Sequence, residues 1–174
     1  SFVASDWERM TEPVANMGVD ADCLGLWHFD GSLNSHKGVA VDSDALFGGG
    51  CFGQALSIAT GKHLKVPTTD ILASTGTINF RAKNLSASAN GSVLIDLPKS
   101  DNTQGLRAGI ASGGRLYIKG ATASTAYGPN KSTLTAWDSI SLAWKSDRLS
   151  LVVNDTEACF IENPGLPTAL GSHV

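Results

Sequence analysis

The 174-residue chain is short of positive charge and of long apolar segments, and each deficit excludes a class of protein. It carries 13 Lys and Arg against 16 Asp and Glu, for a net charge of −3, whereas sequence-independent nucleic-acid binding needs dense cations. No apolar run approaches the ~18 residues of a membrane helix. An apolar fraction of 42% excludes disorder. The sequence therefore predicts one soluble folded domain, with neither nucleic acid nor membrane as a partner.

Glutamate and cysteine are also scarce. Only four Glu stand beside 19 Gly and many Ser and Thr, a composition that disfavours helices and predicts an all-β domain. The three cysteines, Cys23, Cys51 and Cys159, are odd in number, so at least one thiol remains unpaired. This suits folding in a reducing cytoplasm. We expect an extracellular surface or a virion as the final location.

Catalytic motifs are missing as well. The chain has no Glu-x-Asp-x-Glu spacing, which would place an acid and a nucleophile on one strand face for glycoside hydrolysis. It has no Gly-x-Ser-x-Gly elbow, His-Glu-x-x-His helix, Cys-x-x-Cys pair or phosphate loop. The sequence predicts that the protein is not an enzyme.

What is present divides into an N-terminal arm, residues 1–21, and a domain, residues 22–174. Ser5-Asp6-Trp7-Glu8 matches a capping box and predicts a short helix in the arm. The arm either docks on its own domain or on a neighbouring chain, the first being the simpler interpretation.

The domain reads as short strands separated by turns. The segment 77–83 alternates, with Ile78, Phe80 and Ala82 facing inward, while 24–29 is apolar on nearly both faces and predicts a strand buried on two sides. A series of short strands of this kind predicts two antiparallel sheets packed face to face, a β-sandwich. Trp27, Phe29, Phe80 and Trp144 are expected to fill the space between the sheets. The predicted strands are 24–29, 52–58, 63–66, 77–83, 93–97, 106–110, 115–119, 139–145 and 149–153.

Three motifs occur in order: Leu24-Gly-Leu-Trp-His-Phe-Asp-Gly-Ser-Leu-Asn34, Phe52-Gly-Gln-Ala-Leu-Ser57 leading to Lys65-Val-Pro67, and Trp137-Asp-Ser-Ile-Ser-Leu-Ala-Trp144. Together they resemble the laminin-G-like, concanavalin A-like jelly-roll family. Within these motifs, Gly31 is expected to supply a positive φ, and Gly53 to allow an entry that a Cβ would obstruct. The resemblance implies a jelly roll that binds ligands.

The C-terminus departs from that family pattern. Relatives close with a strand beside the opening strand, whereas here a turn-rich stretch, residues 163–167, is followed soon by Gly171-Ser-His-Val174. The closing strand is either disguised or missing. If it is missing, the edge beside residues 24–29 invites association with another chain, as the N-terminal arm also does.

Outward-facing residues of the predicted strands suggest a ligand surface. Arg81 and Lys83, Arg115, Tyr117 and Lys119, together with Ser141 and Lys145, are expected on one sheet face. Tyr127, in the predicted turn 126–129, is a separate aromatic that stacks on a sugar or covers the core. Such a face suits an acidic glycan, a phosphate polymer or an acidic protein patch, although an ordinary solvated face is the simpler interpretation.

A Ca²⁺ site is a further hypothesis. The resemblance implies loop carboxylates as calcium ligands, and Asp30 with Asn34 supplies oxygen ligands after the first predicted strand. Asp42-Ser43-Asp44 is an alternative set. The simpler interpretation of Asp30 is a turn residue whose carboxylate binds nearby backbone N–H groups.

Two functions compete at this point. The leading hypothesis is a non-catalytic binding module that recognises carbohydrate or another surface ligand, such as a protein, within a larger adhesive protein. The alternative is a structural subunit or fragment of a multi-chain assembly, for example a viral particle or tail protein.

Overall fold

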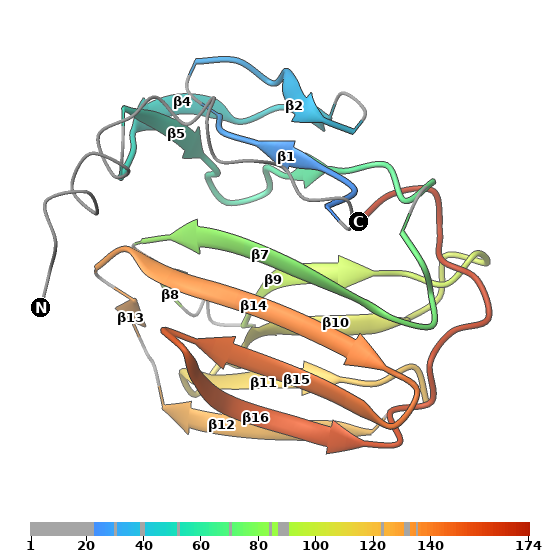
Figure 1. Ribbon diagram of the computed structural model, residues 1–174. Helices are drawn as coiled ribbons and strands as arrows, with labels where there is room; N and C mark the ends of the chain where they lie inside the picture. Colours follow the sequence, from blue (N-terminus) through green and yellow to red (C-terminus); the bar gives the residue numbers. More distant parts are fainter. Residues whose placement is uncertain are drawn as a thin grey trace, which may run out of the picture. The chain divides into compact units, whose positions relative to one another are not determined.

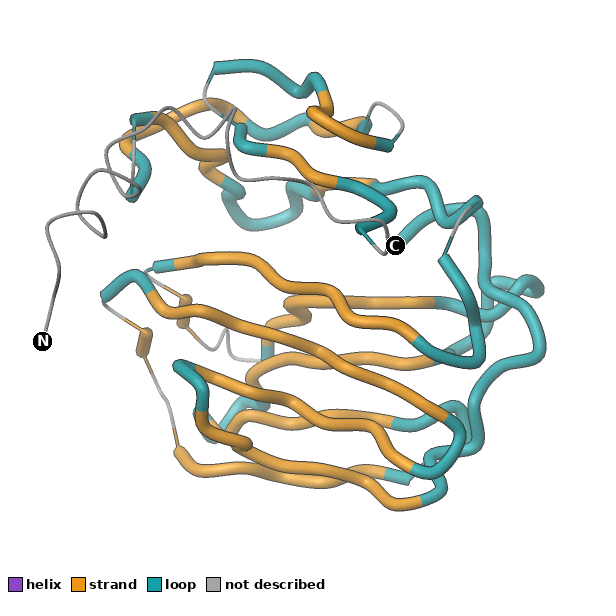
Figure 2. Tube along the Cα trace, viewed as in Figure 1, coloured by secondary structure: helices purple, strands orange, loops and turns teal. Residues whose placement is uncertain are grey.

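The computed structural model describes residues 23–29, 31–38, 41–51, 53–69, 71–83, 85–86, 91–122, 124–130, 133–134 and 136–174. These residues are all-β, as predicted, and none of them is helical (Figure 2). The part of the chain so described holds no helix with the length and apolarity that a membrane crossing requires. The predicted arm and its capping box lie outside it. The chain groups into two compact units, residues 1–66 and 67–174.

The second unit contains two four-stranded antiparallel sheets that face each other (Figure 1). In one sheet the order is β12-β11-β10-β9, with β9 at Ser92–Leu97, β10 at Leu106–Ile110, β11 at Arg115–Lys119 and β12 at Thr125–Asn130. In the other the order is β16-β15-β14-β7, with β7 at Gly76–Ala82, β14 at Asp138–Lys145, β15 at Arg148–Val153 and β16 at Thr156–Glu162. A small ladder pairs β8 (Leu85–Ser86) with β13 (Thr133–Leu134). The predicted sandwich is confirmed.

The core lies between these two sheets because their strands alternate. In β14, Ile140, Leu142 and Trp144 are buried while the residues between them are half-buried. A period of two sends every second side chain to the same face. Burying one such aliphatic side chain stabilises the fold by about 1.5–3 kcal/mol. The completely buried aliphatic residues are Leu97, Leu106, Ile110, Leu116, Ile118, Ile140, Leu142, Leu149 and Leu151.

Of the four aromatic residues expected in the core, two are there. Trp144 is 3% exposed, and Phe80 packs against the core from β7. Trp27 and Phe29 belong to the first unit, where both are half-buried, so that part of the prediction is wrong. Phe29 has a φ of 54°, which an extended strand cannot contain, and it ends the strand early.

The first unit consists of short two-stranded ladders. β1 (Leu26–Trp27) pairs with β2 (Ser35–Lys37), β3 (Asp42–Ser43) with β6 (Leu64–Lys65), and β4 (Leu46–Gly49) with β5 (Gln54–Ser57). The predicted strand 24–29, buried on both faces, is therefore wrong: only two of its residues are paired, and Leu24 is 48% exposed.

Gly31 has the positive φ expected of it, whereas the steric reason expected for Gly53 is wrong. Gly31 has a φ of 98° and Gly53 a φ of 76°, values that only glycine adopts easily. At Gly53, however, an added Cβ would meet no atom within 4 Å. Backbone conformation, not lack of space, therefore explains this glycine.

The C-terminal residues after β16 form no strand, although all of them are described. Residues 163–174 run along the second unit and make two isolated bridges, His173 with Pro67 and Leu170 with Lys99. Pro164 is fully buried and anchors this segment. β7 and β9 thus end their sheets in the second unit.

Candidate functional site

The predicted ligand residues are divided between the two sheets of the second unit. Arg81 lies on β7, with Lys83 just beyond it, whereas Arg115, Tyr117 and Lys119 lie on β11. The prediction that all of them share one sheet face is therefore wrong, since Ser141 and Lys145 on β14 lie in the sheet of Arg81 and not in that of β11. The physical reason is the pairing of β7 with β14, since the outer faces of two packed sheets point in opposite directions.

Tyr127 joins the β11 residues, because it lies on a strand and not in the predicted turn. It is part of β12, and it stands directly opposite Tyr117 in the antiparallel ladder. Gly128-Pro129 resembles a turn in sequence. Here Pro129 lies on the edge strand of its sheet, where a missing N–H breaks no ladder bond.

Four of the six predicted ligand residues thus meet on the outer face of the β9–β12 sheet. We call Arg115, Tyr117, Lys119 and Tyr127 the tyrosine face. The guanidinium of Arg115 lies 5.2 Å from the ring centre of Tyr127, and the Lys119 ammonium lies 5.8 Å from that of Tyr117. Arg115 is fixed further, since its Nε donates to the Gly128 carbonyl at 3.2 Å. Each tyrosine ring therefore carries a cation beside it.

The two rings differ in exposure. Tyr127 is 52% exposed, while Tyr117 is half-buried and lies across Gly109 of β10. A Cβ at Gly109 would lie 2.7 Å from both Cε1 and Oη of Tyr117. Burial raises the pKa of Tyr117, so its phenol stays protonated at neutral pH and both donates and accepts hydrogen bonds.

An ion pair borders Tyr117. Arg107 of β10 and Asp96 of β9 stand opposite each other, with 2.7 Å between Nη2 and Oδ2. This pair raises the pKa of Arg107 and has no net charge. Arg115 and Lys119 leave the tyrosine face two positive charges. Rings and cations in this arrangement suit a ligand with a C–H face and an acidic group.

The opposite face of the sandwich has a different aromatic group. Phe160 of β16 is 43% exposed, and the guanidinium of Arg148 stacks on its ring at 3.8 Å. Arg148 also pairs with Glu157 at 2.7 Å, and the Ser150 hydroxyl donates to Glu157 at 2.7 Å. The charges there compensate each other. Glu157 lies on β16, a strand that the sequence pattern did not predict.

The remaining cations of the prediction lie apart from the tyrosine face. The Lys83 ammonium lies 5.1 Å from the ring centre of Trp137, and Arg81 projects from an exposed position of β7. Their sheet is the one that carries Phe160, so they do not extend the tyrosine face.

The calcium hypothesis gains no described ligand set. Asp30 lies outside the described residues, and Asn34 is exposed, its N–H donating to Ser32 Oγ at 2.9 Å. Within the described ranges no three His, Cys, Asp or Glu side chains group as metal ligands would. The Asp30–Asn34 site stays a prediction.

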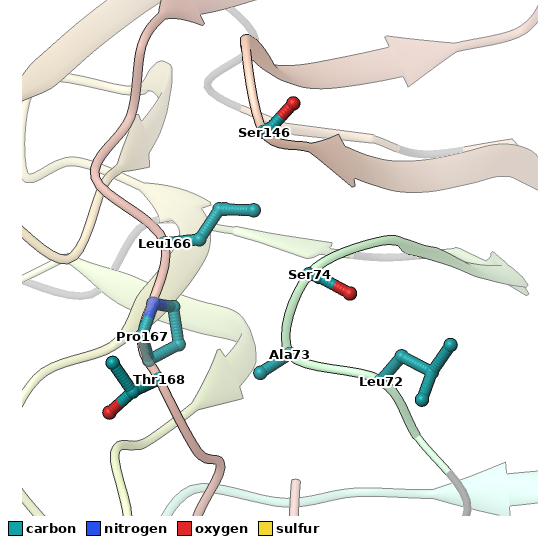
Figure 3. A pocket seen from close by; sticks show the side chains of 7 residues that line it. All are labelled: Leu72, Ala73, Ser74, Ser146, Leu166, Pro167 and Thr168. Carbon is teal, nitrogen blue, oxygen red and sulfur yellow. The ribbon is translucent and has the colours of Figure 1, made fainter.

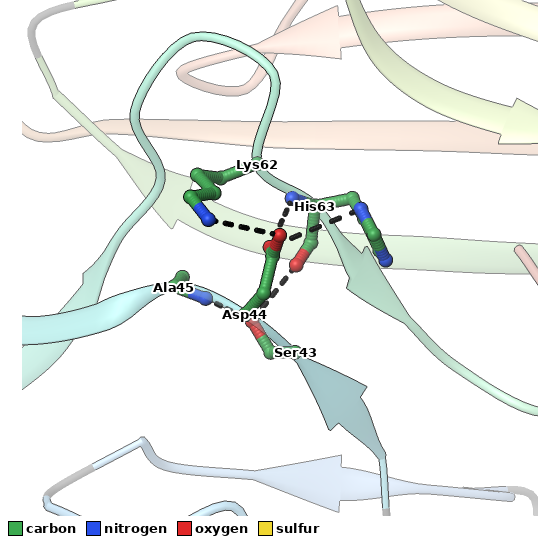
Figure 4. A network of polar contacts seen from close by, with 5 residues as sticks. All are labelled: Ser43, Asp44, Ala45, Lys62 and His63. Carbon is green, nitrogen blue, oxygen red and sulfur yellow. Dashed lines mark hydrogen bonds and ion pairs between the residues drawn. The ribbon is translucent and has the colours of Figure 1, made fainter.

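In the alternative calcium set, Ser43 and Asp44 contact other residues of the chain (Figure 4). Asp44 accepts the His63 backbone N–H at 3.0 Å and pairs with Lys62 at 3.2 Å. Ser43 Oγ donates to the His63 carbonyl at 2.8 Å. These contacts, led by the His63 N–H, lower the pKa of Asp44. The carboxylate holds β3 beside the turn before β6 and is directed at a cation of the chain itself.

A hollow of about 570 Å³ in the second unit shares no residue with the tyrosine face (Figure 3). No lining side chain is an acid or a base, which leaves the hollow without a proton donor or acceptor suited to catalysis. Its lining residues are Leu72, Ala73, Ser74, Ser146, Leu166, Pro167 and Thr168.

Comparison with known proteins identifies the fold. No protein-family model and no curated protein matches the sequence. Among solved structures, the binding domain of Paraclostridial Mosquitocidal Protein 1 matches with a TM-score of 0.63 and 12% identity, over 86% of this chain and 42% of that one. Domains LG4-5 of the mouse laminin alpha1 chain match with a TM-score of 0.48 and 10% identity, over 63% of this chain and 30% of that one. This chain thus covers less than half of either.

The predicted resemblance is therefore confirmed at the level of fold: the chain has a laminin-G-like, concanavalin A-like jelly-roll sandwich. Of the two similar structures, the one from Paraclostridial Mosquitocidal Protein 1 is named as a binding domain, and at 10–12% identity neither carries information on ligand residues. Whatever the tyrosine face does has to be argued from its own chemistry.

Proposed function

We propose that this jelly roll is a non-catalytic binding module that recognises carbohydrate through the tyrosine face. The observation that supports this is the pair Tyr117 and Tyr127, side by side on one outer sheet face with a cation beside each ring. Sugar rings bind proteins by laying C–H groups on aromatic faces while their polar groups hydrogen-bond to the rim.

The electrostatics favour an acidic sugar. Arg115 and Lys119 form no ion pair with a carboxylate within the described residues, so their charges are available to a ligand. Arg115 is held at its Nε by the Gly128 carbonyl, which leaves other N–H donors of its guanidinium for a carboxylate or sulfate. A fixed donor loses less conformational entropy when it binds.

A glycan array with matched variants tests the proposal. Tyr127→Ala removes the exposed ring of the tyrosine face, and Phe160→Ala removes an exposed, Arg-stacked ring from the opposite face as a control. We expect the wild type and Phe160→Ala to bind acidic glycans, and Tyr127→Ala to lose about tenfold or more in affinity, as is typical of a stacked ring. The proposal fails if no glycan binds, or if both variants weaken binding equally.

The assembly alternative makes a different prediction. A structural subunit would form oligomers through a large interface, and their formation would not depend on Tyr127. Light scattering of the purified chain and of Tyr127→Ala separates the two functions.

A further inference from the structure

The tyrosine pair is part of a longer row of residues across the sheet. Val93 on β9 stands opposite Gly109 on β10, Gly109 opposite Tyr117 on β11, and Tyr117 opposite Tyr127 on β12. Each strand thus contributes one residue to the same line on the outer face. We call these four residues the cross-strand row.

The row is continuous and apolar along its length. Its two ends, Val93 and Tyr127, are both 52% exposed. In between, Gly109 has no side chain, and the Tyr117 ring fills the space above it. A Cβ at Gly109 would clash with the Ser92 carbonyl oxygen as well as with this ring, so a side chain there would interrupt the row. Three interstrand spacings of about 4.8 Å give the row a length of about 14 Å, which three hexose rings in a line match.

Charged residues flank this row on both sides. The neighbouring row contains Asp96, Arg107 and Lys119 in register, and Arg115 lies toward the other end of β11. Since Asp96 compensates Arg107, the surplus charge comes from Lys119 and Arg115, which stand on either side of Tyr117 along β11. A ligand on the row therefore meets a cation on each flank.

We infer that the ligand is a linear acidic polysaccharide that crosses the strands along this row and occupies three successive ring positions from Tyr127 to Val93. This rests on the proposed carbohydrate binding at the tyrosine face and specifies its length, direction and charge. A single sugar or a glycan terminus would fill only the tyrosine end. A chain that ran parallel to the strands would leave Val93 without a role.

A length series of one acidic polymer tests the inference by calorimetry. The probes are hyaluronan di-, tetra- and hexasaccharides, with cellotetraose as the neutral control. We expect the tetrasaccharide to bind about tenfold more tightly than the disaccharide, because it reaches the Val93 end, and the hexasaccharide to add little. Cellotetraose should bind more weakly than the hyaluronan tetrasaccharide, and added salt should reduce this difference.

Two variants locate the added ring. Val93→Ser should weaken tetrasaccharide binding and leave disaccharide binding unchanged, while Tyr127→Ala weakens both. Val152→Ser, at a half-buried valine on the outer face of the other sheet, is the control and should change neither. Equal affinity for di- and tetrasaccharide, or an equal effect of Val93→Ser on both, overturns the inference while carbohydrate binding stands. Absence of binding to every saccharide, in the array as well, refutes the proposed function itself.

Discussion

The contact between Gly76 and Trp144 allows the packing of the core to be tested quantitatively. The two residues are partners in the β7–β14 ladder, and the indole lies over the glycine. A Cβ at Gly76 would be 2.4 Å from Cζ2 and 2.8 Å from Cη2 of Trp144. These two nearest atoms lie at the outer edge of the indole, which a phenyl ring does not reach. Gly76→Ala therefore produces a clash that Trp144→Phe should remove.

The expected magnitudes follow from this geometry. Overpacking of a methyl group costs about 1–3 kcal/mol. Alanine otherwise gains about 0.5–1 kcal/mol over glycine in a compatible conformation, so the net loss in the wild type is about 1–2 kcal/mol. In the Trp144→Phe background, Gly76→Ala should be neutral or stabilising by about 0.5 kcal/mol. The coupling free energy between the two positions is then about 2 kcal/mol.

Trp144→Phe has a cost of its own. The indole Nε1 donates to the Leu72 carbonyl at 3.1 Å, and loss of this bond costs about 1 kcal/mol. The smaller ring also leaves part of a buried site empty, which adds to the loss of stability. A double-mutant cycle removes these contributions, because they occur with and without alanine at position 76.

Urea unfolding of the four proteins, followed by far-UV circular dichroism, measures the cycle. Circular dichroism is preferable to fluorescence because two of the four proteins lack Trp144. Gly113→Ala in the 112–114 turn is the control, since its Cβ would meet nothing within 4 Å. If Gly76→Ala costs the same in both backgrounds, within about 0.5 kcal/mol, the packing of the indole on Gly76 is refuted.

Three further predictions concern single groups of β14–β16 and the turns between them. The pKa of Glu157 is lowered from its ordinary value of 4.5, chiefly by the Ser150 hydroxyl, so the ionised carboxylate stabilises the fold fully above that pH and loses this contribution at lower pH. The difference in melting temperature between wild type and Glu157→Gln should therefore shrink at low pH, and a constant difference contradicts this. Burial raises the pKa of Cys159 to about 11, so iodoacetamide at pH 7 should label it only in urea, as peptide mass mapping would show, and native labelling contradicts this. Asn154→Ala should lower the urea-derived stability by about 1–2 kcal/mol, since its Nδ2 donates to the buried Asp138, and an unchanged midpoint contradicts this.

The strands that sequence reasoning found are those with period-two alternation or a clear turn. β10 and β11 were predicted residue for residue, and β7 and β14 to within one residue at either end. In β14, for example, the apolar residues Ile140, Leu142 and Trp144 alternate with small or polar ones and so indicate the buried face. Among the longer strands of the second unit, β12 and β16 were missed. Gly128-Pro129 in β12 reads as a turn, and β16 mixes Glu157 and Phe160 on its outer side, so neither presents a clean pattern.

The candidate site shows the same limit. Tyr117 and the cations of β11 could be recognised as outward-facing, since alternation fixes the side of a strand. Which strand lies next to which is set by long-range pairing. Nothing local indicated that Tyr127 stands opposite Tyr117, or that Arg81 lies on the other sheet.

The sequence by itself determined the class of protein, the laminin-G-like resemblance and the facing of most long strands, because composition and period-two patterning are local properties that burial selects directly. Only the tertiary structure decided which residues make up the proposed ligand face. Register brings Val93, Gly109, Tyr117 and Tyr127 into one row over four strands, and the free energy that chooses this register is spread across the whole core between the sheets.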